Sequence, residues 1–94
     1  MKIVFAPQAR EDLREAIRYI ANDNPVAARR VLAQINKALD LLAGSHVDGR
    51  EVILGSSERV RLWLVASYCL YYRRLGGKLE VIRVYHQARR PVER

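Results

Sequence analysis

The chain has 94 residues, enough to bury one hydrophobic core and too few for a second, so a single domain spanning residues 1–94 is expected. No apolar run approaches the roughly 20 residues that cross a bilayer, and the segment after Phe5 turns polar, unlike an export signal, so we predict a cytoplasmic protein with no membrane partner. The net charge of +7 favours an anionic macromolecular partner, whereas the lone cysteine, Cys69, excludes an internal disulfide and a cysteine-rich zinc site.

The first part of the chain has the pattern of a strand followed by two helices. Lys2–Phe5 is rich in β-branched and aromatic residues, and the following Pro7 cannot donate within a sheet but can begin a helix. From Gln8 to Ala21, and again from Pro25 to Ala43, apolar residues recur at steps of three and four, which predicts two amphipathic helices. Asn24 is a suitable N-cap for the second helix. The short link predicts an antiparallel helical hairpin.

After residue 49 the apolar period changes from helical to alternating. A short extended approach is expected at Arg50–Leu54, followed by strands at Arg59–Leu64, Tyr68–Leu75 and Lys78–His86. Gly76–Gly77 supplies the two positive-φ residues that a tight type I′ hairpin turn requires. The predicted fold class is therefore α+β, in the order β-α-α-β-β-β, with the helical hairpin packed on one face of a small antiparallel sheet.

The positive charge is concentrated in the second half of the chain. Residues 1–48 contain seven Lys/Arg and six Asp/Glu, a balance of +1, whereas residues 49–94 contain ten and four, a balance of +6. Such a field favours nucleic acid, a ribosome or an acidic protein segment without choosing among them. In the first half, Arg10, Arg14 and Arg18 are interleaved with acidic residues, which is typical of a solvated helix face.

Several short motifs, in this order and spacing, carry a resemblance to a known family. They are Ala9-x-x-Asp12-Leu13, Tyr19-Ile20, Asn24-Pro25-x-Ala27-Ala28, Leu39-x-x-Leu42, Gly49-Arg50, Val60-Arg61-Leu62, Tyr68-x-x-x-Tyr72-Arg73 and the strand from Leu79 to His86. Over nearly its whole length the chain resembles the ParE/RelE superfamily of toxins from bacterial type II toxin–antitoxin pairs. The long hairpin with an Asn-Pro turn and the Tyr-x-x-x-Tyr-Arg strand are more similar to the ParE branch. One departure is that Ser45-His46-Val47 fills a stretch where ParE-like chains often carry a proline.

The ParE resemblance implies a toxin that poisons DNA gyrase by binding it and has no catalytic group of its own. It also implies a cognate antitoxin, ParD-like or related, whose flexible C-terminal segment wraps the toxin. An acidic segment rich in apolar residues would suit both the positive field and the apolar edges that a two-helix layer leaves on a sheet. We expect Arg61, Arg83, Arg89 and Arg90 to bind the target. No cofactor is expected, and no recognisable metal spacing joins the two histidines.

The RelE branch implies a different activity, cleavage of messenger RNA on the ribosome. Attack by a ribose 2′-hydroxyl needs a proton acceptor, a proton donor and cations that stabilise the transition state. Arg61, Arg83, Tyr85 and His86 are the candidates, and Arg61 and Arg83 would form a cationic patch if they lay on adjacent strands. The chain has only three lysines, Lys2, Lys37 and Lys78, however, so this alternative is less well supplied with cations. A basic nucleic-acid-binding module with no toxin role is a third hypothesis.

The aromatic residues of the late strands have a simpler interpretation than base stacking. Alternation places Tyr71 on one face of a strand and Tyr68 and Tyr72 on the other, so at least some of them are expected in the core. Cys69 has apolar neighbours and is expected to be a packed thiol. For His86, the simplest expectation is an ordinary hydrogen bond at the end of a strand.

Overall fold

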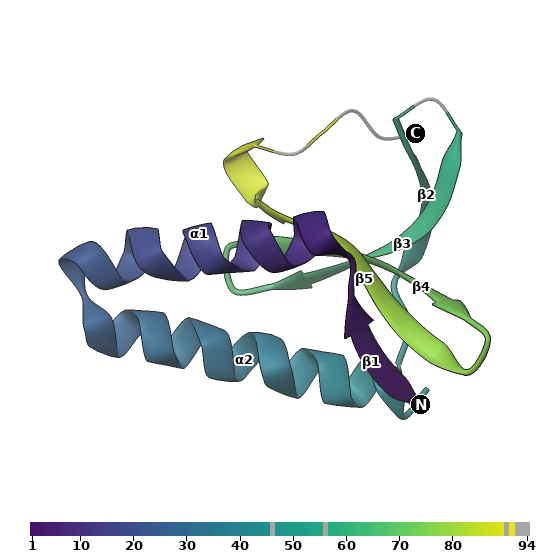
Figure 1. Ribbon diagram of the computed structural model, residues 1–94, viewed down its shortest axis with the longest axis horizontal. Helices are drawn as coiled ribbons and strands as arrows, with labels where there is room; N and C mark the ends of the chain where they lie inside the picture. The colour runs from purple at the N-terminus through teal and green to yellow at the C-terminus, as the bar shows by residue number, and fades with distance from the viewer. Residues whose placement is uncertain (46, 56, 90, 92–94) are drawn as a thin grey trace.

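Two helices pack on one side of a five-stranded sheet in the computed structural model, which describes residues 1–45, 47–55, 57–89 and 91 (Figure 1). The elements are β1 (Lys2–Phe5), α1 (Pro7–Asp23), α2 (Pro25–Ala43), β2 (Arg50–Leu54), β3 (Glu58–Val65), β4 (Tyr68–Leu75), β5 (Lys78–His86) and a short 3₁₀ helix, η1 (Gln87–Arg89). Among the described residues, no helix is long and apolar enough to span a bilayer.

The sheet has the order β1-β5-β4-β3-β2. From β2 to β5 every neighbouring pair is antiparallel, as predicted, and Arg50–Leu54 is a full strand rather than an extended approach. β1 differs, because it pairs with β5 in parallel, with Lys2 opposite Lys78. The sheet as a whole is therefore mixed and has one strand more than the sequence indicated. A parallel pair needs a long connection, and here everything from α1 to β4 provides it.

The turn between the two helices has the capping residues that the sequence predicts. The side-chain oxygen of Asn24 accepts a hydrogen bond from the backbone N–H of Ala27 at 3.0 Å, and Pro25 occupies the first turn of α2. α1 begins one residue earlier and ends two residues later than expected, since Pro7 starts it and no glycine stops it before Asn24. Both helices lie side by side over the sheet, and among the strands α1 contacts β5 most (Figure 1).

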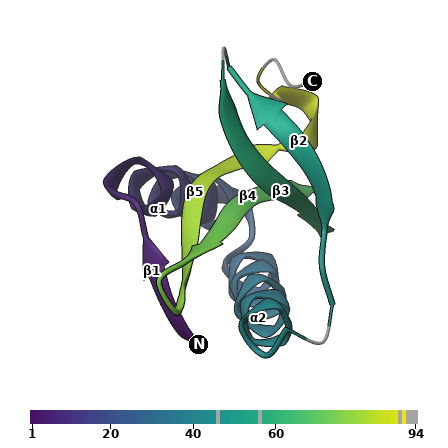
Figure 2. The ribbon, with the colours of Figure 1, turned by 90° about the vertical axis from the view of Figure 1, so that its right-hand side faces the viewer.

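Buried side chains form a core on each face of the sheet. The larger core, between the helices and the sheet, contains Ile35 and Leu39 from α2 together with Tyr68, Tyr72 and other residues of β4 and β5. On the opposite face lies a smaller core, formed by Val52, Leu54, Val60, Leu62, Cys69, Tyr71 and Ile82. β2 and β3 swing away from the helices as the sheet twists (Figure 2). The three tyrosines and Cys69 are thus core residues, which confirms those expectations.

Candidate functional site

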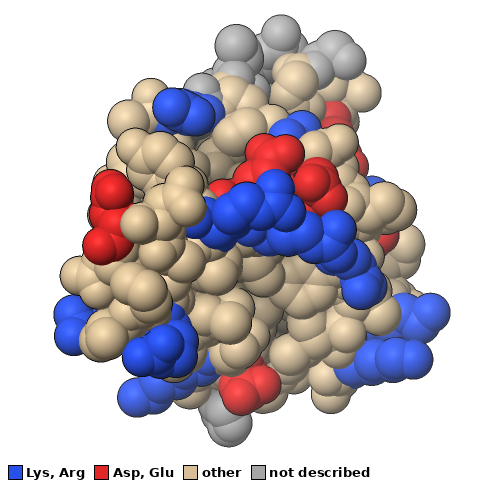
Figure 3. Space-filling model, turned by 60° about the vertical axis from the view of Figure 1, so that its left-hand side comes forward, with Lys and Arg blue, Asp and Glu red and all other residues tan. Residues whose placement is uncertain are grey.

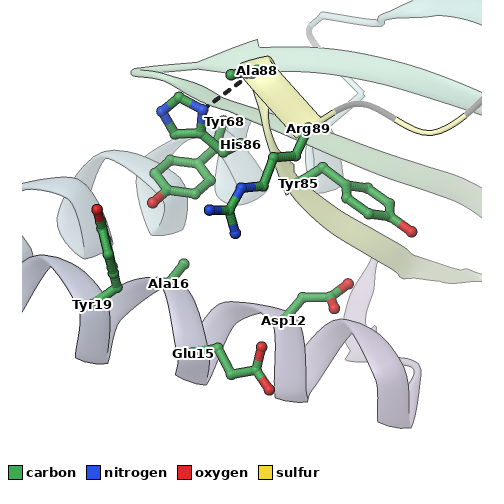
Figure 4. A pocket seen from close by; sticks show the side chains of 9 residues that line it. All are labelled: Asp12, Glu15, Ala16, Tyr19, Tyr68, Tyr85, His86, Ala88 and Arg89. Carbon is green, nitrogen blue, oxygen red and sulfur yellow. Dashed lines mark hydrogen bonds between the residues drawn. The ribbon is translucent and has the colours of Figure 1, made fainter.

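A groove of about 450 Å³ lies between α1 and the end of β5, and we call it the α1–β5 groove. One wall comes from α1 and the other from β5 and η1, with an aromatic residue of β4 between them (Figure 4). The lining residues are Asp12, Glu15, Ala16, Tyr19, Tyr68, Tyr85, His86, Ala88 and Arg89. The floor is mainly apolar and aromatic, while charged groups stand on both walls. Its volume falls within the usual range for binding pockets, roughly 300 to 1,000 Å³.

Three of the residues predicted from sequence meet in this groove, namely Tyr85, His86 and Arg89. Arg83 lies next to them, with its guanidinium carbon 4.5 Å from the ring centroid of Tyr85, a cation–π contact. Arg90 lies outside the described residues, as does His46. The late basic residues of β5 and η1 are therefore neighbours, and they face α1 across the groove.

Asp12 joins α1 to the edge of the sheet beyond the end of β1. Its carboxylate accepts hydrogen bonds from Nε of Arg83 at 2.7 Å, from Nη2 of Arg83 at 3.1 Å and from the backbone N–H of Val84 at 3.0 Å. Burial by itself raises the pKa of Asp12, but the bonds from Arg83 and Val84 outweigh it and hold the pKa below its ordinary value. The backbone edge of β5 at Val84 is therefore already occupied by a side chain of the protein.

His86 makes contacts that stabilise the chain locally. Its Nδ1 accepts a hydrogen bond from the backbone N–H of Ala88 at 3.1 Å, and its ring meets Tyr68 edge-on with the centroids 5.3 Å apart. The first contact caps the 3₁₀ helix that follows β5. This is the ordinary strand-end hydrogen bond that the sequence suggested.

Arg61 lies away from the other predicted residues. β4 separates β3, which carries Arg61, from β5, which carries Arg83. The guanidinium of Arg61 donates to the carbonyl of Gly49 at 2.8 Å and lies 3.4 Å from a carboxylate oxygen of Asp48 and 3.9 Å from one of Glu51. The condition for a joint cationic patch, that Arg61 and Arg83 lie on adjacent strands, is therefore not met, because β4 lies between their strands.

The contacts of Arg61 belong to a network that anchors the loop between α2 and β2. The hydroxyl of Tyr72 donates to Asp48 and accepts from the N–H of Gly49 at 2.7 Å. Arg74 lies 3.0 Å from the Asp48 carboxylate and donates to the carbonyl of Leu42 at 2.9 Å. Burial and the bond to Asp48 raise the pKa of Tyr72 to about 12. Because these groups bond to one another, with only Nε of Arg74 left without a hydrogen-bond partner among the described residues, we assign the network to the fold rather than to a ligand.

Several basic side chains of the described residues lie next to acidic ones. On the face shown in Figure 3, a band of Lys and Arg side chains borders a group of Asp and Glu side chains. Arg59, Arg61 and Arg73 each lie within 4.0 Å of a carboxylate, as does Arg83. Within the described part of the chain, Arg89 is an arginine with no such ion pair, and it lines the groove. It is therefore the predicted target residue best placed to meet an external anion.

Comparison with known proteins identifies the family. A family model for the ParE toxin of the type II toxin–antitoxin system parDE matches residues 3–91. The chain belongs to the ParE toxin family. It is also similar to a solved chain of the chromosomal ParDE toxin–antitoxin system from P. aeruginosa, with a TM-score of 0.72 and 16% identity, covering 92% of this chain and 95% of that one. At that identity the likeness shows the fold. None of the curated proteins compared with the chain matches it.

The structure also adds residues to this ParE-family site that sequence reasoning missed. In the sequence, Asp12 and Tyr19 were singled out only as residues of the family motifs. A signal for Asp12 did exist, because it stands three residues after Ala9 and four before Ala16, within the apolar stripe of α1. A carboxylate in an apolar stripe needs a partner across the interface, which here is Arg83.

Proposed function

We propose that the chain is the toxin of a type II toxin–antitoxin pair, that it acts in the cytoplasm by binding and poisoning DNA gyrase, and that a cognate antitoxin neutralises it. The observation that carries this proposal is the match of the ParE family model to residues 3–91, which runs from β1 through η1. The antitoxin is proposed to be ParD-like, with a flexible C-terminal segment that is acidic and rich in apolar residues. The net charge of +7 suits such a partner.

The contacts of the predicted catalytic residues support a binding role over RNA cleavage. A nuclease site needs a base, an acid and cations gathered around one phosphate. Arg61 is two strands from His86 and contacts Asp48 and Glu51, while Arg83 is held by Asp12. The Nδ1 of His86 already accepts a backbone hydrogen bond. A binding protein needs none of these groups to be free for proton transfer.

Arg89 is the described residue to which we give the main role in gyrase binding. It is exposed and lies in the groove, and Arg83 contributes from the adjoining strand. We propose Arg90 as a further contact from its place in the sequence, and Arg61 as a peripheral one, since its ion pairs reduce the charge it offers. In this proposal, target binding uses the end of β5 and the segment that follows it.

The test combines purified chain with purified gyrase and, separately, with translating ribosomes. We expect inhibition of supercoiling and accumulation of gyrase-linked DNA breaks, with messages left intact on the ribosomes. Arg89→Glu should weaken gyrase inhibition about tenfold or more, since it reverses a charge at the contact. Arg30→Glu, an equal charge change at an exposed position of α2, is the matched control and should behave like wild type.

His86→Ala separates the two activities. A nuclease that used this imidazole as acid or base would lose about 10²-fold or more in rate, whereas gyrase inhibition should stay within about threefold, because the contact of His86 with Ala88 is local. Cut messages together with unaffected gyrase would overturn the proposal in favour of the ribosome-dependent endoribonuclease.

A further inference from the structure

A second hollow, of about 180 Å³, lies beside the network that anchors the loop between α2 and β2, and it shares no lining residue with the α1–β5 groove. We call it the arginine hollow, because four arginines line it. A guanidinium group is always charged, and its planar set of N–H donors matches carboxylate and phosphate oxygens. The side chains that line the hollow include Glu51, Arg59, Arg61, Tyr72, Arg73 and Arg74.

The pairing of β2, β3 and β4 explains why these side chains meet. Glu51 is directly opposite Arg61, and Arg61 is directly opposite Tyr72. Residues opposite each other project from the same face of a sheet, as do residues two apart on one strand, so Arg59 lies on that face as well. Three neighbouring strands thus bring their charged side chains to one place.

The arginines differ in how firmly they are held. Arg61 donates to the carbonyl of Gly49 at 2.8 Å, and Arg74 donates to a carbonyl at the end of α2 at 2.9 Å. The side chain of Arg59 is 75% exposed. Two of the cations are therefore fixed by the fold, which lowers the entropic cost of binding an anion, and a third lies at the exposed rim.

Glu51 supplies the carboxylate among the side chains that line the hollow. Its oxygens lie 3.7 Å from Nη1 of Arg59 and 3.9 Å from Nη2 of Arg61, so two guanidinium groups share it at distances too long for hydrogen bonds. Its side chain is 59% exposed, and exposed ion pairs contribute little to stability. An external anion can therefore displace Glu51 at small cost.

A phosphate group fits this arrangement better than a second carboxylate does. It has several acceptor oxygens around one centre, so it can accept hydrogen bonds from guanidinium groups that approach from different strands. The volume of the hollow is below the roughly 300 to 1,000 Å³ of pockets that enclose a whole small molecule. It therefore suits one phosphate group rather than a nucleoside attached to it.

We propose that the arginine hollow binds a phosphate group, with Arg59 and Arg61 as its main donors and Glu51 as the internal anion that it displaces. Inorganic phosphate and the backbone of duplex DNA both carry this chemistry, and the experiment below distinguishes them. The inference goes beyond the proposed function, because it requires neither gyrase nor an antitoxin.

The test titrates the labelled full chain with inorganic phosphate at constant ionic strength and follows backbone and guanidinium N–H signals by NMR. Saturable shifts are expected at Arg59 and Arg61. Arg59→Gln should weaken the affinity about fivefold or more, whereas Glu51→Gln should strengthen it about threefold, because the competing carboxylate is gone. The controls are Arg30→Gln, at an exposed position of α2, and Glu11→Gln, in the exposed pair with Arg14, and both should stay within about twofold of wild type.

The same variants are then mixed with a short DNA duplex, and binding is measured by fluorescence anisotropy over a range of salt concentrations. If the hollow takes a backbone phosphate, the DNA affinities change in the same directions, and Arg59→Gln lowers the salt slope by about one. If only the affinity for inorganic phosphate changes, the site binds free phosphate. If Arg59→Gln and Glu51→Gln match their controls with both probes, the charge acts only as a diffuse field and the inference is overturned.

Discussion

At the scale of single residues, Asp12 accepts a hydrogen bond from the edge of β5 that a neighbouring strand would otherwise accept. β1 ends at Phe5, opposite Val81, so among the described residues the rest of β5 has no neighbouring strand on that side. The carboxylate of Asp12 fills part of this gap by accepting from Val84 N–H and from Arg83. Its side chain is 10% exposed and that of Arg83 is 29% exposed, so the pair is less screened by water than a surface ion pair. We therefore expect it to contribute measurably to stability.

The first prediction is that Asp12→Asn lowers the free energy of unfolding by about 2 kcal/mol at neutral pH, the scale of hydrogen bonds to charged groups. Urea denaturation of the purified chain measures it. Glu11→Gln is the matched control on the same helix, because the Glu11–Arg14 pair is well exposed, and its effect should stay under about 0.5 kcal/mol. Equal losses for the two variants would contradict the structural role of Asp12.

The Asp12→Asn variant also tests how the free energy of unfolding depends on pH. Because the pKa of Asp12 is lower in the folded chain than in the unfolded one, its contribution is fully present above the unfolded pKa of about 4 and is lost as pH falls through the folded pKa. The difference in stability between wild type and Asp12→Asn should therefore be constant from about pH 7 down to about pH 5 and should shrink below about pH 4. If this difference in stability grew on acidification, folding would raise the pKa of Asp12 and the prediction would be wrong.

At the scale of elements, the loop into β2 depends on one close backbone approach. A Cβ built on Gly49 would lie 2.0 Å from the carbonyl oxygen of Leu62, a backbone atom that cannot rotate away. Gly49 also donates to Tyr72 and accepts from Arg61. This explains physically the glycine of the Gly49-Arg50 pair that the family resemblance included. The glycine is required by space, whereas Gly76–Gly77 is required by positive φ in the hairpin turn.

We predict that Gly49→Ala destabilises the chain by about 3 kcal/mol, the upper end of overpacking effects. β2 must shift away from β3, so hydrogen exchange should quicken in β2 while β5 is little affected. Gly55→Ala is the comparison, since its Cβ meets open space and only its φ of 64° is unfavourable, which costs about 1 kcal/mol. If the two variants have the same stability, Gly49 does not act through close packing.

The elements themselves were largely predictable, and their spatial neighbours were less so. Local signals such as Asn24–Pro25 and Gly76–Gly77 act over a few residues, so both hairpins and the strands at Tyr68–Leu75 and Lys78–His86 appear as expected. The parallel pairing of β1 depends on a contact between opposite ends of the chain, which no local pattern encodes.

The candidate site was predictable only in part, for a related reason. Tyr85, His86 and Arg89 are close in sequence and meet in one groove, whereas the place of Arg61 depends on strand order, which puts β4 between its strand and β5. Two successive hairpins already imply that β4 separates β3 from β5, so the sequence could have shown that the condition for the patch is not met. Tyr19 and Glu15 reach the groove only through the packing of α1 on β5, which cannot be read from alternation or charge.

For the whole molecule, the net charge of +7 should act on the rate of association more than on the lifetime of a complex. We predict that the association rate with the proposed acidic antitoxin falls about tenfold or more between about 20 mM and about 500 mM NaCl, as the screening length shortens. The dissociation rate should change much less. Stopped-flow mixing measures both rates, and an association rate independent of salt would contradict electrostatic steering.

The pairing of Lys2 with Lys78 also has a consequence for synthesis of the toxin. The first strand leaves the ribosome long before its partner, which is the last strand to be made, and contacts between distant parts of a chain form late. A message interrupted before β5 would yield a product that lacks both the central neighbour of β4 and the partner of β1. Translation must therefore pass β5 before this toxin domain can fold.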